Sequence, residues 1–316
     1  MNTSSTFAMG HGPKSAFLIV GGTGTTGLAL VQLLLQKTEH TLLITSRRGQ
    51  DGIPSELSKT YGDRVKGIQF SWEDRSRYRT LFSDNSTKIE AIFLIPPSTG
   101  YTDKSAHILI DIAVARDVQR VVLLSDTVHE KGDHSIGAQV HVHLNGLKQR
   151  GTLGVYAVLR SSWFYEREDL LKKNCLSSMT QGGKIGWVDV ETIAETAFRA
   201  LVDDPSDVFE QYIVTGPEAL SYDEIASLLT RTLERSIVHH HLTEDQLVAH
   251  YKDMGLNDEF IEFYVECDRR VASGREEAVF NLETNSAESL KRVRGTKRLS
   301  EFLEENKHVL IPDTNR

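Results

Sequence analysis

Three glycines near the start of the chain have the spacing of a phosphate-binding turn. Gly21, Gly24 and Gly27 form a G-x-x-G-x-x-G pattern directly after an apolar run at residues 16–20 and before a helical pattern. Glycines there permit a tight turn and close approach of the backbone to a pyrophosphate, and the following helix would point unpaired N–H groups at it. An ordinary glycine-rich turn is the alternative, but the strand–turn–helix context favours nucleotide binding. The cofactor-binding loop would also include Thr23 and Thr25.

The end of the second apolar run bears on which nucleotide would bind. A site that prefers NAD(H) has an acidic residue there, which accepts a hydrogen bond from the ribose 2′-hydroxyl. This chain has Arg47 and Arg48 after Ser46 instead. Because a guanidinium can form paired hydrogen bonds with a 2′-phosphate, these residues predict NADP(H). The alternative is a pair of solvated surface arginines.

The tyrosine–lysine pair of ordinary short-chain carbonyl reductases is absent. None of the nine tyrosines is followed by a lysine four residues later. Carbonyl reduction needs a proton as well as a hydride, so another group would have to supply it. The helical pattern after the fifth apolar run contains His141 and His143, which cannot share one helix face. His141 is the stronger candidate to face the cofactor cleft as an acid or hydrogen-bond donor; alternatively, both rings are partly exposed helix residues.

Other candidate residues follow predicted strands. Trp163, Phe164 and Tyr165 come after the sixth apolar run, where a doubly wound sheet opens toward its ligand crevice, and they could wall an apolar substrate pocket. Core packing of Trp163 and Phe164 is the alternative, and both interpretations can hold. We place Pro96 and Ser125 near the nicotinamide ribose. The catalytic candidates are His141, Ser125 and Tyr165.

Neither the histidines nor the cysteines predict a metal site. His239, His240 and His241 fall in a predicted strand at residues 236–242. Neighbouring side chains of a strand point to opposite faces, so three consecutive rings cannot bind one ion. Cys175 and Cys267 are the only cysteines, and neither has a basic partner in the sequence that would activate it. We therefore expect no metal, and a structural or solvated role for these histidines.

The elements that must position these residues alternate between strands and helices. Apolar runs predict strands at residues 16–20, 41–45, 67–71, 90–95, 121–125 and 156–159, with helical patterns between them, as at 102–116. This alternation predicts an α/β fold with a doubly wound parallel sheet of the Rossmann type. Later patterns predict helices at 189–201 and 222–233, strands at 211–214 and 236–242, and mostly helices over 243–309 with a polar break at 283–286.

These patterns divide the chain into three parts. We expect residues 1–13 to be a disordered tail and residues 14–160 to form an NADP-binding Rossmann domain. Residues 161–316 would form a smaller, mostly helical and discontinuous substrate lobe, some of whose segments return to the Rossmann sheet.

Composition limits the classes of function. The 316 residues include 39% hydrophobic side chains, enough for a sizeable core. The formal net charge of −8 gives no basic surface for nucleic acid or an anionic membrane. No apolar stretch is long enough to span a bilayer, and the first residues lack the apolar core of a signal peptide. We therefore expect a cytoplasmic protein that binds a small molecule and neither nucleic acid nor membrane.

Taken in order, the motifs resemble those of the NmrA-like atypical short-chain dehydrogenases, and more narrowly of the ergot-alkaloid-type fungal reductases, the agroclavine and festuclavine dehydrogenase group. The resemblance rests on residues 20–24, 46–47, 71–74, 140–141, 158–164, 186–190, 193–194, 215–219, 292–297 and 299–306. Two positions depart from the family pattern. Ser161 stands where the family usually has proline, and the asparagine that usually follows the aromatic cluster is absent near Glu166.

The resemblance implies NADP(H) at the carboxyl ends of the strands, with Trp72 and Asp74 among the cofactor-binding residues. It also implies an NADPH-dependent reductase of fungal alkaloid metabolism that transfers hydride to an iminium or carbonyl carbon of a polycyclic substrate. An iminium already carries the positive charge, so hydride delivery completes its reduction without a proton donor. Two alternatives are a redox-neutral cyclase or rearrangement enzyme with a Brønsted-acid side chain, and a non-catalytic NADP(H)-sensing regulator.

Overall fold

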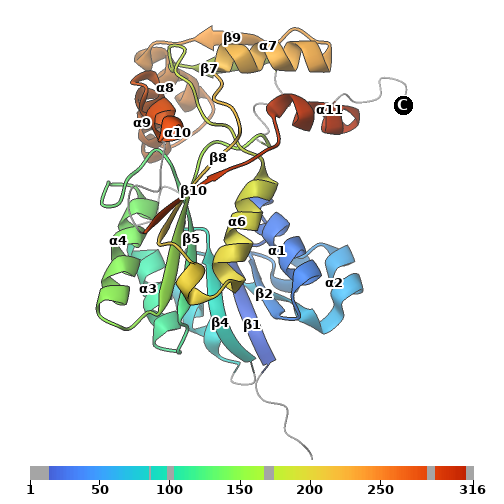
Figure 1. Ribbon diagram of the computed structural model, residues 1–316, viewed down its shortest axis with the longest axis vertical. Coiled ribbons are helices and arrows are strands. Elements are labelled where there is room, and N and C mark those ends of the chain that lie inside the picture. The colour runs from blue at the N-terminus through green and yellow to red at the C-terminus, as the bar shows by residue number, and fades with distance from the viewer. Residues whose placement is uncertain (1–13, 85–86, 98–102, 167–173, 283–288, 311–316) are drawn as a thin grey trace, which may run out of the picture.

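The computed structural model of the chain describes residues 14–84, 87–97, 103–166, 174–282 and 289–310 (Figure 1). The predicted tail at 1–13 and the predicted polar break at 283–286 lie outside the described residues.

An eight-stranded parallel sheet forms the body of the molecule (Figure 1). Its strands are β1 (Lys14–Val20), β2 (Thr41–Ser46), β3 (Val65–Gln69), β4 (Thr87–Leu94), β5 (Arg120–Asp126), β6 (Val155–Ser161), β8 (Gln211–Thr215) and β10 (Leu290–Arg294). Their order across the sheet is β10-β8-β6-β5-β4-β1-β2-β3. The chain thus winds outward in both directions from the β1/β4 pair, which confirms the predicted doubly wound fold. In such sheets the ligand crevice lies beyond the carboxyl ends of the strands at this switch point.

Helices cover both faces of the sheet, which explains the continuous apolar runs. On one face lie α1 (Thr25–Lys37), α2 (Ser55–Tyr61) and α6 (Val190–Val202), and on the other α3 (Asp103–Val114) and α4 (Ile136–Gln149). Along β1, Phe17 and Ile19 join one core cluster while Leu18 and Val20 join the other. Short 3₁₀ segments span Gly49–Gly52, Gly62–Arg64, Arg75–Phe82 and Pro205–Asp207.

A smaller lobe lies over the carboxyl ends of the central strands (Figure 1). It contains α7 (Tyr222–Leu233), α8 (Glu244–Asp253), α9 (Asp258–Ala272), α10 (Arg275–Asn281), α11 (Leu299–Leu310) and a two-stranded parallel sheet of β7 (Cys175–Ser178) and β9 (Val238–His241). Its core includes the fully buried Trp187, whose indole N–H donates to the carbonyl of Leu220 at 3.2 Å. The lobe is mostly helical, as predicted.

Two strands differ from the sequence interpretation. β10 lies in a region predicted to be helical, and β7 was not predicted. Among the described residues, β10 lies at the edge of the sheet and pairs only with β8. It carries Lys291, Arg292 and Arg294, so it lacks the apolar run of a central strand. None of the described helices is both long and apolar enough to cross a membrane.

Candidate functional site

The glycine turn connects β1 to α1 and leaves the start of that helix open. Gly21 has a φ of 85°, which favours glycine, and a Cβ on Gly27 would lie 2.2 Å from the carbonyl oxygen of Gly21. Gly24 is the N-cap residue of α1 and provides no side-chain cap, and the first turn holds no acidic residue. Thr23, Gly24 and Thr25 are exposed. The free N–H groups and the positive end of the helix dipole can therefore receive an anion such as a pyrophosphate.

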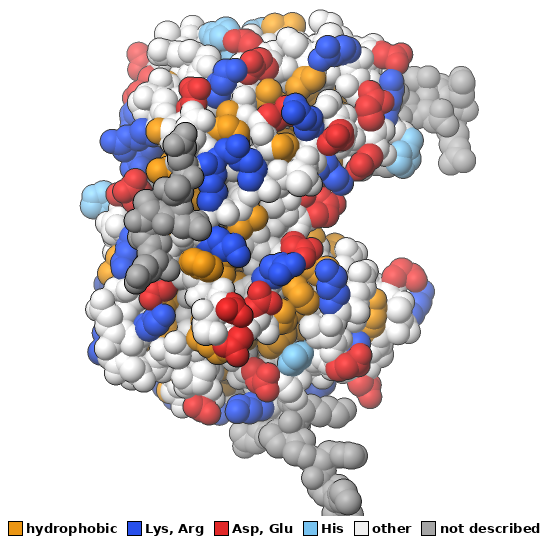
Figure 2. All heavy atoms as spheres, viewed as in Figure 1, with side chains coloured by type: hydrophobic (Ala, Val, Ile, Leu, Met, Phe, Trp, Pro, Cys, Tyr) orange, Lys and Arg blue, Asp and Glu red, His pale blue; other side chains and the backbone are white. Residues whose placement is uncertain are grey.

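The two arginines of the second strand end lie beside this turn. Arg47 and Arg48 follow β2 and are exposed, and β2 pairs directly with β1. Within the described part of the chain, neither guanidinium has a hydrogen-bond or ion-pair partner. Figure 2 shows the surface indented between the lobe at the top and helices α1 and α2 below it. Both guanidinium groups are thus available to a phosphate.

Unlike the guanidinium groups of Arg47 and Arg48, the side chains of Trp72 and Asp74 after β3 are held by contacts within the described structure. The Trp72 ring packs edge-on against Phe70 at 5.0 Å between centroids. Asp74 accepts a hydrogen bond from Arg77 Nε at 2.9 Å and another from the Ser76 hydroxyl. These bonds, that from Ser76 first, hold the pKa of Asp74 below its usual value. Asp74 is therefore an ionised acceptor.

Two adjoining cavities lie at the carboxyl ends of β4, β5 and β6. The first, of about 810 Å³, is lined by Ile95 and Pro96 after β4 and by Ser125 of β5. The second, of about 760 Å³, extends toward Trp163 and Phe164 after β6. Residues common to both cavities are Leu124, Ser125, Asp126, Phe260, Phe263 and Tyr264. Ile95 links the cavities to the glycine turn, since a Cβ on Gly21 would lie 3.0 Å from its side chain.

The cavity walls combine aromatic rings with an excess of negative charge. Helix α9 contributes Phe260, Phe263 and Tyr264, at the spacing of one helix face. The first cavity is also lined by five carboxylates, Asp126, Asp133, Glu259, Glu262 and Glu266. The one guanidinium in that lining, Arg270, is 3.1 Å from Asp133 and 2.9 Å from Glu266. Such walls suit an apolar ligand that carries positive charge.

An aspartate–histidine pair in the first cavity was not predicted. Asp126 Oδ1 lies 2.8 Å from His129 Nδ1 and also accepts a hydrogen bond from the His129 backbone N–H at 2.9 Å. The imidazole stacks on Phe263 at 5.5 Å between centroids. The carboxylate therefore orients the ring and fixes which nitrogen carries the proton. The sequence signal was the Asp-x-x-His spacing immediately at the end of β5.

Beneath this pair lies a buried polar link between the lobe and the sheet. The Thr127 hydroxyl donates to Glu276 Oε2 of α10 at 2.7 Å, and Arg160 of β6 donates to the Thr127 carbonyl at 3.1 Å. Burial raises the pKa of Glu276 to about 7, although the Thr127 hydrogen bond opposes the shift. Glu276 therefore titrates near neutral pH.

Of the predicted pocket residues, the structure brings Pro96, Ser125, Trp163 and Phe164 to the cavity walls. His141 is not among the described residues that line either cavity. It lies on the buried face of α4, where its ring is 5.9 Å from that of Tyr156 and its Nε2 atom has no hydrogen-bond partner in the described structure. Burial is the main cause that lowers the pKa of His141, to about 4. The expectation that His141 faces the cleft is therefore wrong, because the helix turns it toward the sheet.

Tyr165 is also placed away from the cavities. Its ring is fully buried against Phe302, and its hydroxyl donates to the carbonyl of Lys297 at 3.1 Å. Burial raises its pKa above the usual value. Tyr165 thus belongs to the core of the lobe. Of the three consecutive aromatic residues, the described cavity lining includes Trp163 and Phe164. His143 contacts Asp111 of α3 at 2.7 Å instead of the cleft.

Comparison with known proteins agrees with this architecture. No protein-family profile matches the chain. Festuclavine synthase II of Penicillium roqueforti is 32% identical over 276 residues, which cover 84% of this chain and 90% of the relative. Agroclavine dehydrogenase of Claviceps purpurea is 30% identical over 280 residues, covering 85% and 91%.

The fold also matches solved structures. The NADPH-dependent quinone oxidoreductase of Escherichia coli, solved as a complex with NADPH, superimposes with a TM-score of 0.67 at 17% identity, covering 92% of this chain and 99% of that one. This likeness concerns the fold. Together with the sequence identity over most of both chains, it shows that the protein belongs to the oxidoreductase family of the fungal festuclavine synthases and agroclavine dehydrogenases.

Proposed function

We propose that the protein is an NADPH-dependent reductase that transfers hydride to the iminium carbon of a polycyclic alkaloid. The observation that carries this proposal is the position of Ile95 between the glycine turn and the first cavity. This residue contacts the glycine turn on one side and lines an aromatic, carboxylate-rich cavity of about 810 Å³ on the other. A cofactor held at the turn would thus reach a cavity suited to a large, apolar cation.

The chain has suitable groups for each part of the cofactor. Gly21, Gly24 and Gly27 would hold the pyrophosphate at the start of α1, and Arg47 with Arg48 would bind the 2′-phosphate. Thr23 and Thr25 would add hydroxyl groups to the turn. Trp72 and Asp74 would complete the cofactor-binding group after β3, and Pro96 and Ser125 would border the nicotinamide ribose. Three features fit such a ligand: the open helix start, the close glycine packing, and two guanidinium groups that have no partner among the residues the structure describes.

The cofactor, when bound, supplies a hydride, and the residues of the chain position and stabilise the acceptor. The carboxylates of Asp126 and Glu259 favour a positively charged substrate in the cavity, whereas Glu262 is paired with Arg269 at 3.0 Å. Trp163 and Phe164 with the rings of α9 exclude water and attract a cation through their π faces. An iminium needs no proton after hydride transfer, so the missing tyrosine–lysine pair does not prevent this reaction. The names of the alkaloid-forming relatives support the same substrate class.

Isotope transfer tests the proposal directly. The purified chain is incubated with NADPH deuterated at C4 and a panel of polycyclic iminium substrates, and the products are analysed by mass spectrometry. We expect deuterium at the former iminium carbon and one NADPH consumed per product. A parallel reaction with unlabelled NADPH in D₂O controls for label taken up from solvent. Product that forms without cofactor-derived deuterium would refute hydride transfer.

A redox-neutral cyclisation or rearrangement is the second candidate. His129 with protons on both ring nitrogens would be a Brønsted acid in the first cavity, and Asp126 would stabilise its positive charge. This candidate predicts a product of unchanged mass and no net consumption of NADPH. In that case His129→Gln should abolish product formation while NADPH binding, measured by calorimetry, remains. Turnover that survives in His129→Gln would exclude this second candidate.

A further inference from the structure

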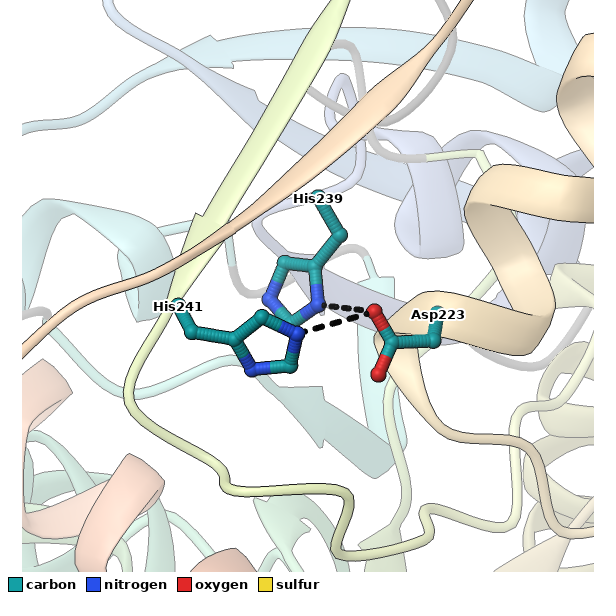
Figure 3. Close-up of side chains that lie close together, drawn as sticks. All are labelled: Asp223, His239 and His241. Atoms are coloured by element: carbon teal, nitrogen blue, oxygen red, sulfur yellow. Dashed lines mark hydrogen bonds and ion pairs between the residues drawn. The ribbon is translucent and has the colours of Figure 1, made fainter.

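A cluster of two histidines and one aspartate lies in the lobe, outside the cavities described above. Figure 3 shows the rings of His239 and His241 turned toward the carboxylate of Asp223. One ligand atom from each residue lies within 4.8 Å of the other two. His239 and His241 are alternate residues of β9, so both side chains share one face of the strand. His240, between them, is not part of the cluster. The sequence interpretation considered only the three consecutive rings and missed Asp223 of α7.

The donor atoms are close to the separations that a metal ion requires. Asp223 Oδ1 lies 2.8 Å from His239 Nδ1 and 3.1 Å from His241 Nε2. Two ligands about 2.1 Å from a tetrahedral ion lie about 3.4 Å apart, so small side-chain rotations would open the site. Two imidazoles and one carboxylate are donors that divalent transition metals accept.

The remaining nitrogen of His239 is held by a second layer of contacts. Its Nε2 atom lies 2.8 Å from the Ser178 hydroxyl, which lies 2.8 Å from the Thr180 hydroxyl, and both hydroxyl side chains are buried. Hydroxyl groups can donate or accept. The Ser178 hydroxyl can therefore accept a hydrogen bond from a protonated Nε2 of His239, which leaves Nδ1 of that ring free for a metal. Metal-binding histidines usually have such an oriented outer partner.

We propose that Asp223, His239 and His241 form a binding site for one divalent transition-metal ion of the Zn²⁺ class. Three protein ligands leave at least one coordination position for water, and His241, with 57% of its side chain exposed, places that position toward solvent. The ion would join the first turn of α7 to β9.

This position gives the ion a structural connection to the second cavity. Tyr222, the residue before Asp223, stacks on the His239 ring at 5.5 Å between centroids and lines the cavity with Trp163 and Phe164. The cluster itself does not line either cavity among the described residues. The bound ion therefore fixes one wall of the cavity and takes no part in the chemistry.

Zinc titration of the full chain tests this site without any measurement of turnover. Protein freed of its purification tag and dialysed against a chelator is titrated with Zn²⁺ by calorimetry, and its Tm is measured with and without the ion. His240→Ala is the matched control, because it removes the neighbouring histidine of the same strand. His241→Ala removes an exposed ligand, and circular dichroism verifies that both variants are folded.

We expect wild type and His240→Ala to bind one Zn²⁺ per chain and to gain Tm on binding. His241→Ala should lose about tenfold or more in affinity, together with the gain in Tm. Asp223→Asn keeps the size of the side chain but removes its charge, and it should also lower the affinity for Zn²⁺ relative to wild type. Absence of saturable binding in wild type, or equal loss in His240→Ala and His241→Ala, would overturn the proposal.

Discussion

Substitution of Gly27 by alanine tests the close packing of the glycine turn against α1. A methyl group there would lie 2.2 Å from the Gly21 carbonyl oxygen and 2.7 Å from the Gly22 Cα, both backbone atoms. Relief of these contacts needs roughly 1 Å of movement at the start of α1. Overpacking of this kind costs about 1–3 kcal/mol. Both neighbours are backbone atoms that cannot rotate away, so the cost falls in the upper part of this range, about 2–3 kcal/mol. The higher helix propensity of alanine returns at most about 1 kcal/mol, so Gly27→Ala should destabilise the protein by at least about 1 kcal/mol.

Gly146→Ala is the matched control inside another helix. Its added methyl would meet the end of the flexible Arg150 side chain at 3.2 Å, and that side chain can move. The propensity gain of up to about 1 kcal/mol should then prevail. Urea unfolding of both variants beside wild type measures the difference, and calorimetry with NADPH should show weaker binding in Gly27→Ala only. Equal stability of Gly27→Ala and wild type would refute the packing argument for the turn.

Three further outcomes are expected. Arg47→Ala should weaken NADPH binding by about 1.5–3 kcal/mol, roughly tenfold or more, and leave NADH binding unchanged; calorimetry showing equal losses for both cofactors would contradict the assignment of the 2′-phosphate site. His129→Gln should slow reduction of a carbonyl substrate by about 10²–10⁴-fold and that of an iminium far less, because only the carbonyl product needs a proton; equal slowing in steady-state kinetics would contradict this role. Glu276→Gln should change how stability depends on pH. Burial raises the pKa of Glu276 to about 7 in the folded chain, so the folded state binds the proton more tightly than the unfolded state. Stability is therefore lost as pH rises from the unfolded pKa toward 7. In urea unfolding, the free energy of unfolding of Glu276→Gln should change less with pH between pH 5 and 8 than that of wild type. Parallel pH profiles of the two proteins would contradict the assignment.

The central sheet could be predicted because its strands are buried on both faces. The centres of β1, β2 and β5, at residues 16–20, 42–44 and 121–123, are apolar and buried, and local sequence alone reveals such runs. β10 could not be predicted in this way. Its pairing with β8 is supplied by residues far away in the sequence, and two of its basic side chains, Arg292 and Arg294, pack against Phe280 of α10.

The same difference separates the predicted site residues that line the cavities from those that do not. Pro96 and Trp163 follow strands of one parallel sheet and Ser125 lies near the end of another, and the carboxyl ends of these strands necessarily meet at one edge. His141 and Tyr165 depended on the rotation of a helix and of a loop, which only the packed structure determines. The sequence predicted mostly helices over residues 243–309, but the aromatic face of α9 was not identified, and the position of α9 depends on contacts such as that between Arg270 and Asp133.

The cofactor is easier to predict than the substrate because different parts of the molecule would bind them. The glycine turn and Arg47 lie within one strand–helix–strand unit, so their arrangement is encoded locally. Many carboxylates and rings of the cavity come instead from α9 and from the end of β5 and the segment after it, which are joined through contacts such as that of the Arg270 guanidinium with the Val128 carbonyl. Changes in the lobe can therefore alter the charge and shape of the cavity without disturbing the glycine turn. Substrate preference in this family should accordingly vary with α9 and the residues that fix its position, while the cofactor stays the same.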